Sequence, residues 1–193
     1  HVVVFLFVAM LMAASHAPYY SFFSIQLGDL GYSRTTIGIL WAFAVVAEVI
    51  LFSQGGWLLA RFTLVRLLGA ALAVTALRWL VMGYFADVEP ALWFAQGAHA
   101  ISFGLFHLAS IEYVRRSFVY GTQGRGQALY SALGFGLGAA VGSAGAGTLW
   151  ASGGPQVAYL WAALACGVAL AALLLAFSYA KFPAVLSQIG EDR

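Results

Sequence analysis

Residues 37–52 read IGILWAFAVVAEVILF, an apolar run that contains a single charged residue, Glu48. The hydrocarbon core of a bilayer is about 30 Å thick, and a helix needs about 20 mostly apolar residues to cross it. Similar runs recur along the whole chain of 193 residues, of which 63% are hydrophobic and only 8% are charged. Soluble domains carry about 25% charged residues. The sequence therefore predicts an all-α membrane protein rather than a soluble, secreted or disordered one.

Short polar or Gly/Pro-containing breaks divide the chain into segments of membrane-spanning length. Together these segments account for nearly the whole chain, so we expect one six-helix transmembrane bundle over residues 1–193. The predicted spans cover approximately residues 2–26, 35–57, 63–84, 91–114, 124–150 and 156–180.

Basic residues gather on one side of the predicted bundle. The breaks on that side and the tail contain Arg61, Arg66, Arg115, Arg116, Arg125 and Lys181. The breaks on the other side contain Arg34, Asp29, Asp87 and Glu89. Because cytoplasmic loops are rich in Lys and Arg, we expect both termini in the cytoplasm and the bundle in the cell (inner) membrane. Two triplets of spans that start from opposite sides form a 3+3 inverted repeat, a plan common in transporters.

Ionisable side chains inside a membrane span are energetically costly, so each one is a candidate functional group. Glu48, Arg78 and His99 lie on the second, third and fourth predicted spans. At 1.5 Å per residue, the three fall within about 10 Å of the same depth. An arginine can pair with the carboxylate or release it on protonation, and a histidine titrates near neutral pH. The spacing predicts a proton-coupling group; a buried structural pair of Glu48 and Arg78, with His99 as a neighbour, is the alternative.

Polar and aromatic side chains form stripes on three spans, which we interpret as the lining of a substrate cavity. On the first span, Pro18 interrupts the helix, and irregular backbone at membrane depth is tolerated beside protein or a cavity. Residues at i, i+3, i+4 and i+7 share one helical face. An interfacial aromatic belt is the alternative for the first stripe. The predicted substrate-binding residues are His16, Tyr19, Tyr20, Phe23, Gln96, Ser102, Phe103, Phe106, Gln127 and Tyr130.

Two further patterns concern helix packing. Gly134, Gly138 and Gly142 recur every four residues on the fifth span, a spacing that lets helix backbones approach closely in lipid. His107 lies about 80° round an α-helix from His99. We therefore expect His107 to contact a neighbouring helix instead of joining the coupling group.

Several segments resemble the second half of a major facilitator superfamily transporter, and more narrowly the phenylpropionate permease family. The resemblance covers about residues 11–180. Its most specific pieces are SHAPYYSFFSIQLGDLGYS at 15–33, IGILWAFAVVAEVILF at 37–52, ALRWLVMG at 76–83, QGAHAISFGLFHLAS at 96–110 and GRGQALYSALGFGLG at 124–138.

The resemblance implies twelve helices in two six-helix bundles around a central cavity, so that this chain is the C-terminal bundle and the N-terminal bundle is absent from it. More distantly, proton symporters of the lactose permease type couple protons through a Glu, an Arg and a His-plus-Glu pair on the corresponding helices. Glu48, Arg78 and His99 are similar to the first three members. The fourth position is occupied by Ser102, and we expect Glu48 itself to be the final proton carrier.

We therefore expect a proton-coupled symporter of a small organic solute, with an aromatic carboxylate such as phenylpropionate favoured. The alternatives are a sugar or nucleoside symporter, an efflux pump, or a non-transporting six-helix membrane subunit. An enzyme, a cofactor or a metal site is not expected, because the sequence shows no metal-spaced histidines, nucleophile with an adjacent base or phosphate loop. A net charge of +2 gives no basic patch for nucleic acid. The chain begins with His1 inside an apolar stretch, so we expect it to be part of a longer protein.

Overall fold

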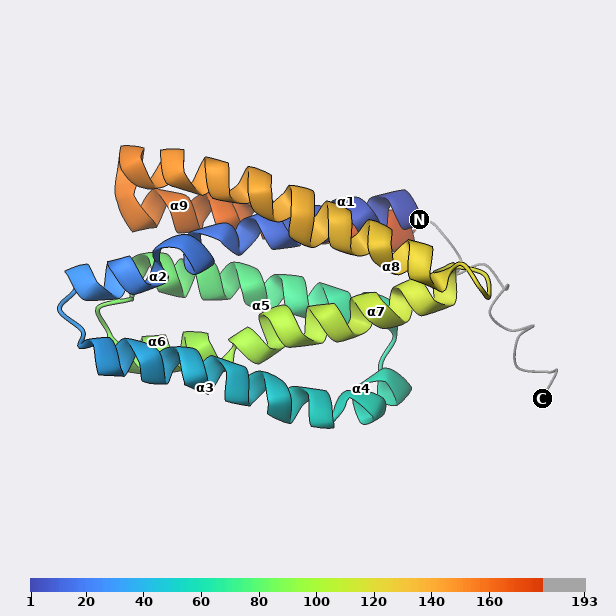
Figure 1. Cartoon of the computed structure of the whole chain (residues 1–193), viewed down its shortest axis with the longest axis horizontal. Coiled ribbons are helices and arrows are strands. Elements are labelled where there is room, and N and C mark those ends of the chain that lie inside the picture. Colours follow the sequence, from blue (N-terminus) through green and yellow to red (C-terminus); the bar gives the residue numbers. More distant parts are fainter. Residues whose placement is uncertain (179–193) are drawn as a thin grey trace.

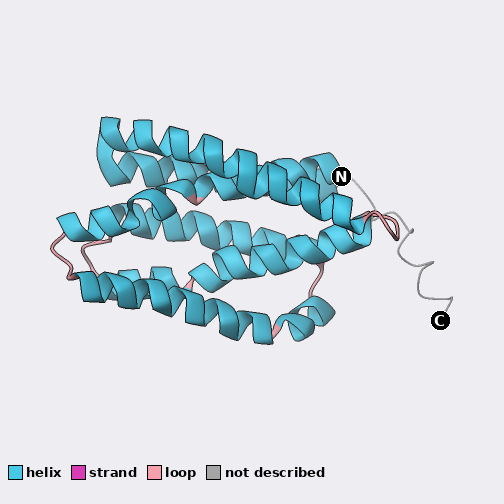
Figure 2. Cartoon of the chain, viewed as in Figure 1, coloured by secondary structure: helices cyan, strands magenta, loops and turns pink. Residues whose placement is uncertain are grey.

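A computed structural model describes residues 1–178 of the chain. Within that range the elements are helical, with short connections and no strand (Figures 1 and 2). The all-α class is therefore confirmed. The last two residues of the predicted sixth span and Lys181 lie outside the described residues. In chain order the elements are α1 (Val2–Ser15), α2 (Ala17–Asp29), α3 (Arg34–Ser53), α4 (Gly55–Arg61), α5 (Leu64–Tyr84), α6 (Glu89–Gly97), π-helix η1 (Ala100–Leu105), α7 (Phe106–Ser117), α8 (Gln123–Ser131), π-helix η2 (Ala132–Gly138) and α9 (Ala139–Ser178).

Four helical stretches are long and apolar enough to cross a membrane: Val2–Asp29, Arg34–Ser53, Leu64–Tyr84 and Gln123–Phe177. The last stretch is too long for one crossing, and its backbone leaves helical geometry within it. Gly154 has a positive φ of 67° and is followed by Pro155, a pair suited to a reversal because glycine tolerates that φ and proline lacks a backbone donor. The gold and orange-red limbs of α9 accordingly run back along each other in Figure 1.

The helices begin and break where side-chain chemistry predicts. The hydroxyls of Ser33 and Thr63 accept hydrogen bonds from the backbone N–H groups of Thr36 and Arg66, which satisfies donors that the first helical turn leaves free. His16 separates α1 from α2, and Pro18 lies in the first turn of α2, where its missing N–H is tolerated. The first predicted span is thus one interrupted helix.

Glycines bring the η2–α9 segment close to α1. A Cβ built on Gly138 would lie 2.6 Å from the Met10 carbonyl oxygen, and one on Gly142 would lie 2.6 Å from the Ala14 carbonyl oxygen. No side chain fits at these distances, so only glycine permits this approach. The expectation of close backbone packing on the fifth span is confirmed at both positions. This contact fixes one wall of the cavity described below.

Candidate functional site

Arg78 on α5 lies at the centre of a buried polar cluster and is fully inaccessible to solvent. Its Nε donates to the Ala95 carbonyl oxygen at 2.7 Å, its Nη2 to Gln96 Oε1 at 3.3 Å and its Nη1 to Ser102 Oγ at 3.4 Å. The guanidinium carbon also lies 4.3 Å from the centroid of the Tyr19 ring. Neutral oxygens and aromatic faces therefore hold this cation.

Glu48 on α3 contacts His99, which lies between α6 and η1. The Glu48 Oε1 atom is 2.6 Å from His99 Nε2, and the two side chains are 14% and 5% exposed. The second ring nitrogen of His99, Nδ1, is buried and has no hydrogen-bond partner in the part of the chain that the structure describes. One carboxylate and one imidazole thus form a close pair with an unused nitrogen beside it.

Glu48 contacts His99 directly, whereas no direct ion pair joins it to Arg78 within the described residues. Within residues 1–178, no ion pair joins the Arg78 guanidinium to a carboxylate. The Glu48–Arg78 pair considered from the sequence is therefore corrected. Instead, the Arg78 guanidinium donates its hydrogen bonds to neutral oxygens near the junction of α6 and η1. These belong to the Ala95 carbonyl and to the side chains of Gln96 and Ser102.

The π-helix η1 aligns three rings along one face. The rings of His99 and Phe103 stack with centroids 5.5 Å apart and planes 10° apart, and those of Phe103 and His107 with centroids 6.0 Å apart and planes 4° apart. A π-helix has a wider turn than an α-helix, so the rotation assumed from the sequence does not apply here. His107 contacts a neighbouring helix, since its Nδ1 lies 3.2 Å from the Tyr130 hydroxyl on α8, but it also lies in line with His99.

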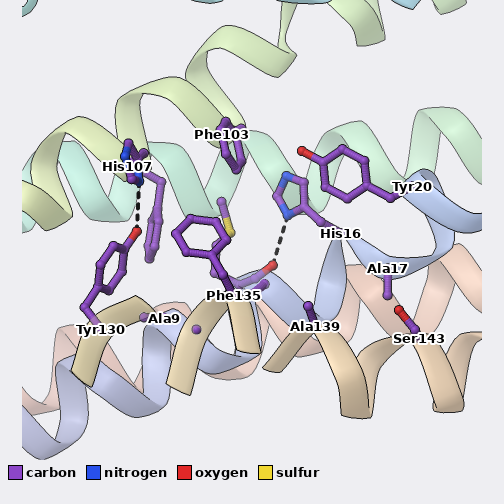
Figure 3. Close-up of a pocket in the computed structure, with 14 residues that line it drawn as sticks. Ala9, His16, Ala17, Tyr20, Phe103, His107, Tyr130, Phe135, Ala139 and Ser143 are labelled. Carbon is purple, nitrogen blue, oxygen red and sulfur yellow. Dashed lines mark hydrogen bonds between the residues drawn. The ribbon is translucent and has the colours of Figure 1, made fainter. Parts of the chain in front are cut away.

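A cavity of about 140 Å³ adjoins these rings (Figure 3). Five predicted substrate-binding residues line it: His16, Tyr20, Phe103, Phe106 and Tyr130. Most of the remaining wall is apolar.

His16 adds a polar side chain to that wall. The residue is 97% buried, its Nδ1 lies 2.9 Å from the Met12 carbonyl oxygen, and its Nε2 has no hydrogen-bond partner among residues 1–178. The His16 ring also contacts Phe103 at a centroid distance of 6.0 Å and Trp79 at 4.8 Å. Because Trp79 in turn contacts the guanidinium of Arg78, His16 connects the cavity to the buried cluster.

The other five predicted substrate-binding residues do not line this cavity. Tyr19 and Phe23 are fully buried, whereas Tyr20 is 52% exposed. The predicted stripe of His16, Tyr19, Tyr20 and Phe23 covers about 100° of the helix surface. Residues at its two edges therefore face different surroundings. Gln96 and Ser102 are buried against Arg78, and Gln127 lies half-buried on α8 away from the lining.

Sequence reasoning missed part of the opposite wall. His107, Phe135 and Ser143 line the cavity but were not among the predicted residues. Phe135 lies in η2, within the sequence ALGFGLG. Alternating glycines in an otherwise good helical run are the signal that could have indicated altered backbone there, because glycine weakens regular helix.

An apolar helical bundle that buries a charged cluster beside a cavity is a multi-pass membrane protein. The chain belongs to the MFS_1-like family of the major facilitator superfamily, whose family model matches residues 1–161. The superfamily resemblance seen in the sequence is thereby confirmed. The relatives that follow are named as a transporter and a permease.

Two curated relatives are similar to this chain. It is 34% identical over 165 residues to a probable 3-phenylpropionic acid transporter of Escherichia coli (strain K12), covering 83% of this chain and 42% of the relative. It is 38% identical over 122 residues to a maltose permease of Geobacillus stearothermophilus, covering 62% of this chain and 30% of the relative. The chain therefore spans less than half the length of either relative. No solved structure matches the chain significantly.

Proposed function

We propose that this chain is the C-terminal six-helix bundle of a proton-coupled secondary transporter of the inner membrane. In this proposal α6, η1 and α7 together form the fourth span, and the two limbs of α9 belong to the fifth and sixth. The spans then form two inverted triplets, with both termini in the cytoplasm. An N-terminal bundle outside this chain completes the substrate path.

The contact between Glu48 and His99 carries the proposal. Arg78 stays positively charged at any accessible pH, and ionised Glu48 balances that charge inside the bundle. Protonation of Glu48 leaves the buried cluster with a net positive charge, which is costly at membrane depth. The preferred packing of the helices around it therefore depends on whether the proton is present, which is the requirement for coupling proton movement to alternating access.

The cavity favours a planar anionic substrate. Phe103, Phe106 and Phe135 offer aromatic faces, and the Nε2 atom of His16 is a buried nitrogen that lacks a partner. The Met12 carbonyl oxygen can only accept, so Nδ1 carries the proton of the neutral ring. Nε2 therefore donates to a carboxylate when the ring is protonated at both nitrogens, while an aromatic ring packs on the phenylalanines. We therefore propose an aromatic carboxylate of the phenylpropionate type, as the name of the Escherichia coli relative suggests.

A sugar is the second candidate, because the other relative is a maltose permease. A sugar needs several hydrogen-bonding groups around its hydroxyls. Here most of the wall is apolar, and the Tyr130 hydroxyl is already engaged by His107. Competition for uptake distinguishes the two: phenylpropionate should inhibit uptake of a labelled aromatic carboxylate, and excess maltose should not. Inhibition by maltose alone would favour the sugar.

Replacing Glu48 with Gln tests the coupling. Gln keeps the shape but cannot ionise, so proton-driven accumulation should be lost while substrate counterflow persists. The complete transporter is reconstituted in vesicles, and its thermal stability is measured in parallel. Glu89→Gln is the matched control, because Glu89 is exposed and contacts only Trp93 among its described hydrogen bonds. A folded Glu48→Gln protein that still accumulates substrate against its gradient would contradict the proposal.

A further inference from the structure

His107 has the surroundings of a second proton-carrying group. It lies eight residues after His99, in the same stack of rings, and it lines the substrate cavity. Its Nδ1 is engaged by the Tyr130 hydroxyl at 3.2 Å (Figure 3). The hydrogen bond at one ring nitrogen of a neutral histidine determines whether the other nitrogen, here Nε2, donates or accepts a proton.

The two imidazoles cannot exchange a proton directly, because the Phe103 ring lies between them. The Phe103 centroid lies 5.5 Å from that of His99 and 6.0 Å from that of His107. The two imidazoles are therefore well beyond hydrogen-bond distance of each other. An apolar ring neither donates nor accepts a proton. A proton that reaches His99 therefore needs another carrier to reach His107.

Glu48 lies in the right place to be that carrier. A Cβ built on Gly104 would be 3.5 Å from Glu48 Cγ, so the glutamate side chain packs against η1 at Gly104. His107 follows Gly104 by three residues, a spacing that places both on one helical face. The Glu48 carboxylate contacts His99 Nε2 at 2.6 Å. Because Gly104 has no side chain, the Glu48 side chain can lie close to the helix backbone at this point.

We propose that His107 accepts the proton from Glu48 and releases it toward the cavity. This inference rests on the proposed function of Glu48. In the proposed tautomer Nδ1–H donates to the Tyr130 oxygen, which leaves Nε2 as the basic nitrogen. The O–H bond of the Glu48 carboxyl group breaks as the N–H bond at Nε2 forms, giving a carboxylate and an imidazolium. The imidazolium then gives the Nε2 proton to water in the cavity, which restores neutral His107.

Replacing His107 with Gln in the complete transporter tests this step. Gln can still hydrogen-bond to Tyr130 but cannot carry the proton. Proton-driven uptake should fall about 100-fold, as expected when a positioned acid–base group is lost, and counterflow should persist. Uptake by the variant should also lose its dependence on pH in the range where histidine titrates. Glu48 on α3 and Tyr130 on α8 are the titratable groups facing His107, so both are left intact in this variant.

Two further variants keep the test decisive if His107→Gln does not fold. Gly104→Ala fills the space beside Glu48 and should slow proton-driven uptake several-fold. Gly69→Ala is its control, because a Cβ there would meet Leu170 at 3.6 Å, away from the site. Tyr130→Phe releases Nδ1 and should shift the pH dependence of uptake, whereas Tyr159→Phe removes a buried hydroxyl without a hydrogen-bond partner and should not.

The outcomes separate this inference from the proposed function. If Glu48→Gln still accumulates substrate, the proposed coupling fails and the role of His107 fails with it. If Glu48→Gln loses accumulation but His107→Gln keeps both accumulation and the wild-type pH profile, only the role of His107 is overturned. Where His107→Gln does not fold, unchanged proton-driven uptake by Gly104→Ala and an unchanged pH profile for Tyr130→Phe overturn it. Loss of accumulation with preserved counterflow in both Glu48→Gln and His107→Gln supports the proposed route.

Discussion

Arg78 and the Glu48–His99 pair are both buried charged groups, yet they are held differently. All three nitrogens of the Arg78 guanidinium donate hydrogen bonds to neutral oxygens, and its face packs on the rings of Tyr19 and Trp79. Glu48 and His99 share one short contact, while His99 Nδ1 lacks a partner and Glu48 remains partly exposed. The permanent charge is fixed in place, and the titratable pair keeps room to change partners.

The difference follows from the cost of burying charge. A guanidinium that never loses its proton must have its donors satisfied wherever it is buried, because an unpaired charge in a medium of low dielectric is strongly destabilising. A carboxylate or imidazole can instead become neutral. We therefore expect substitutions around Arg78 to change the free energy of unfolding, and substitutions at Glu48 or His107 to change transport.

The largest expected effect is that of Arg78→Lys. Lysine carries a compact ammonium group and cannot reach the Ala95, Gln96 and Ser102 oxygens together as the guanidinium fork does. Two buried acceptors lose their donors, which should lower the free energy of unfolding by about 3 kcal/mol. Thermal unfolding of the purified complete protein in detergent measures the change. Glu48→Gln serves as the comparison and should lower the unfolding temperature by less than Arg78→Lys does, because the hydrogen bonds of the guanidinium remain. A larger loss for Glu48→Gln would contradict this expectation.

Gln96→Glu should act in the opposite direction. Gln96 Oε1 accepts from both the Tyr19 hydroxyl and Arg78 Nη2, while Gln96 Nε2 is a buried donor without a partner. A carboxylate there removes the unused donor and turns the contact with Arg78 into a charge-assisted pair. The free energy of unfolding should rise by about 2 kcal/mol.

The matched control for that variant is Gln26→Glu. Gln26 is also a buried amide, but its Nε2 donates to the Met82 carbonyl oxygen, and it lines a polar recess that also contains Asp29 and Asp87. A carboxylate at Gln26 loses the bond to Met82 and gains no cation, so this variant should unfold at a lower temperature. If both variants change stability in the same direction, a carboxylate hydrogen-bonded to the Arg78 guanidinium is no better placed than one at position 26.

The sequence predicted the helical class, and its polar breaks lie where helices end, because hydrophobic runs and Pro/Gly breaks are local properties. It also placed Glu48, Arg78 and His99 on adjacent helices by depth. It did not predict which two of them touch, because a contact depends on how each helix is rotated about its axis. It also did not predict the alignment of His99 with His107, because η1 changes the rotation between them. The same limit applies to Tyr19 and Tyr20, adjacent residues of which one is buried and the other lines the cavity.

The smallest expected effect compares two buried tyrosines whose rings both contact Trp79. The Tyr19 hydroxyl donates to Gln96 Oε1 at 3.0 Å, so Tyr19→Phe removes one buried hydrogen bond and should lower the free energy of unfolding by about 1 kcal/mol. The ring remains, and with it the contact to the guanidinium. Tyr159→Phe makes the same chemical change at a hydroxyl without a hydrogen-bond partner and should leave stability unchanged or slightly raised. If both variants lower the free energy of unfolding equally, the hydrogen bond from Tyr19 to Gln96 adds nothing to stability. The oxygens around Arg78 would then not act as a connected hydrogen-bonded group.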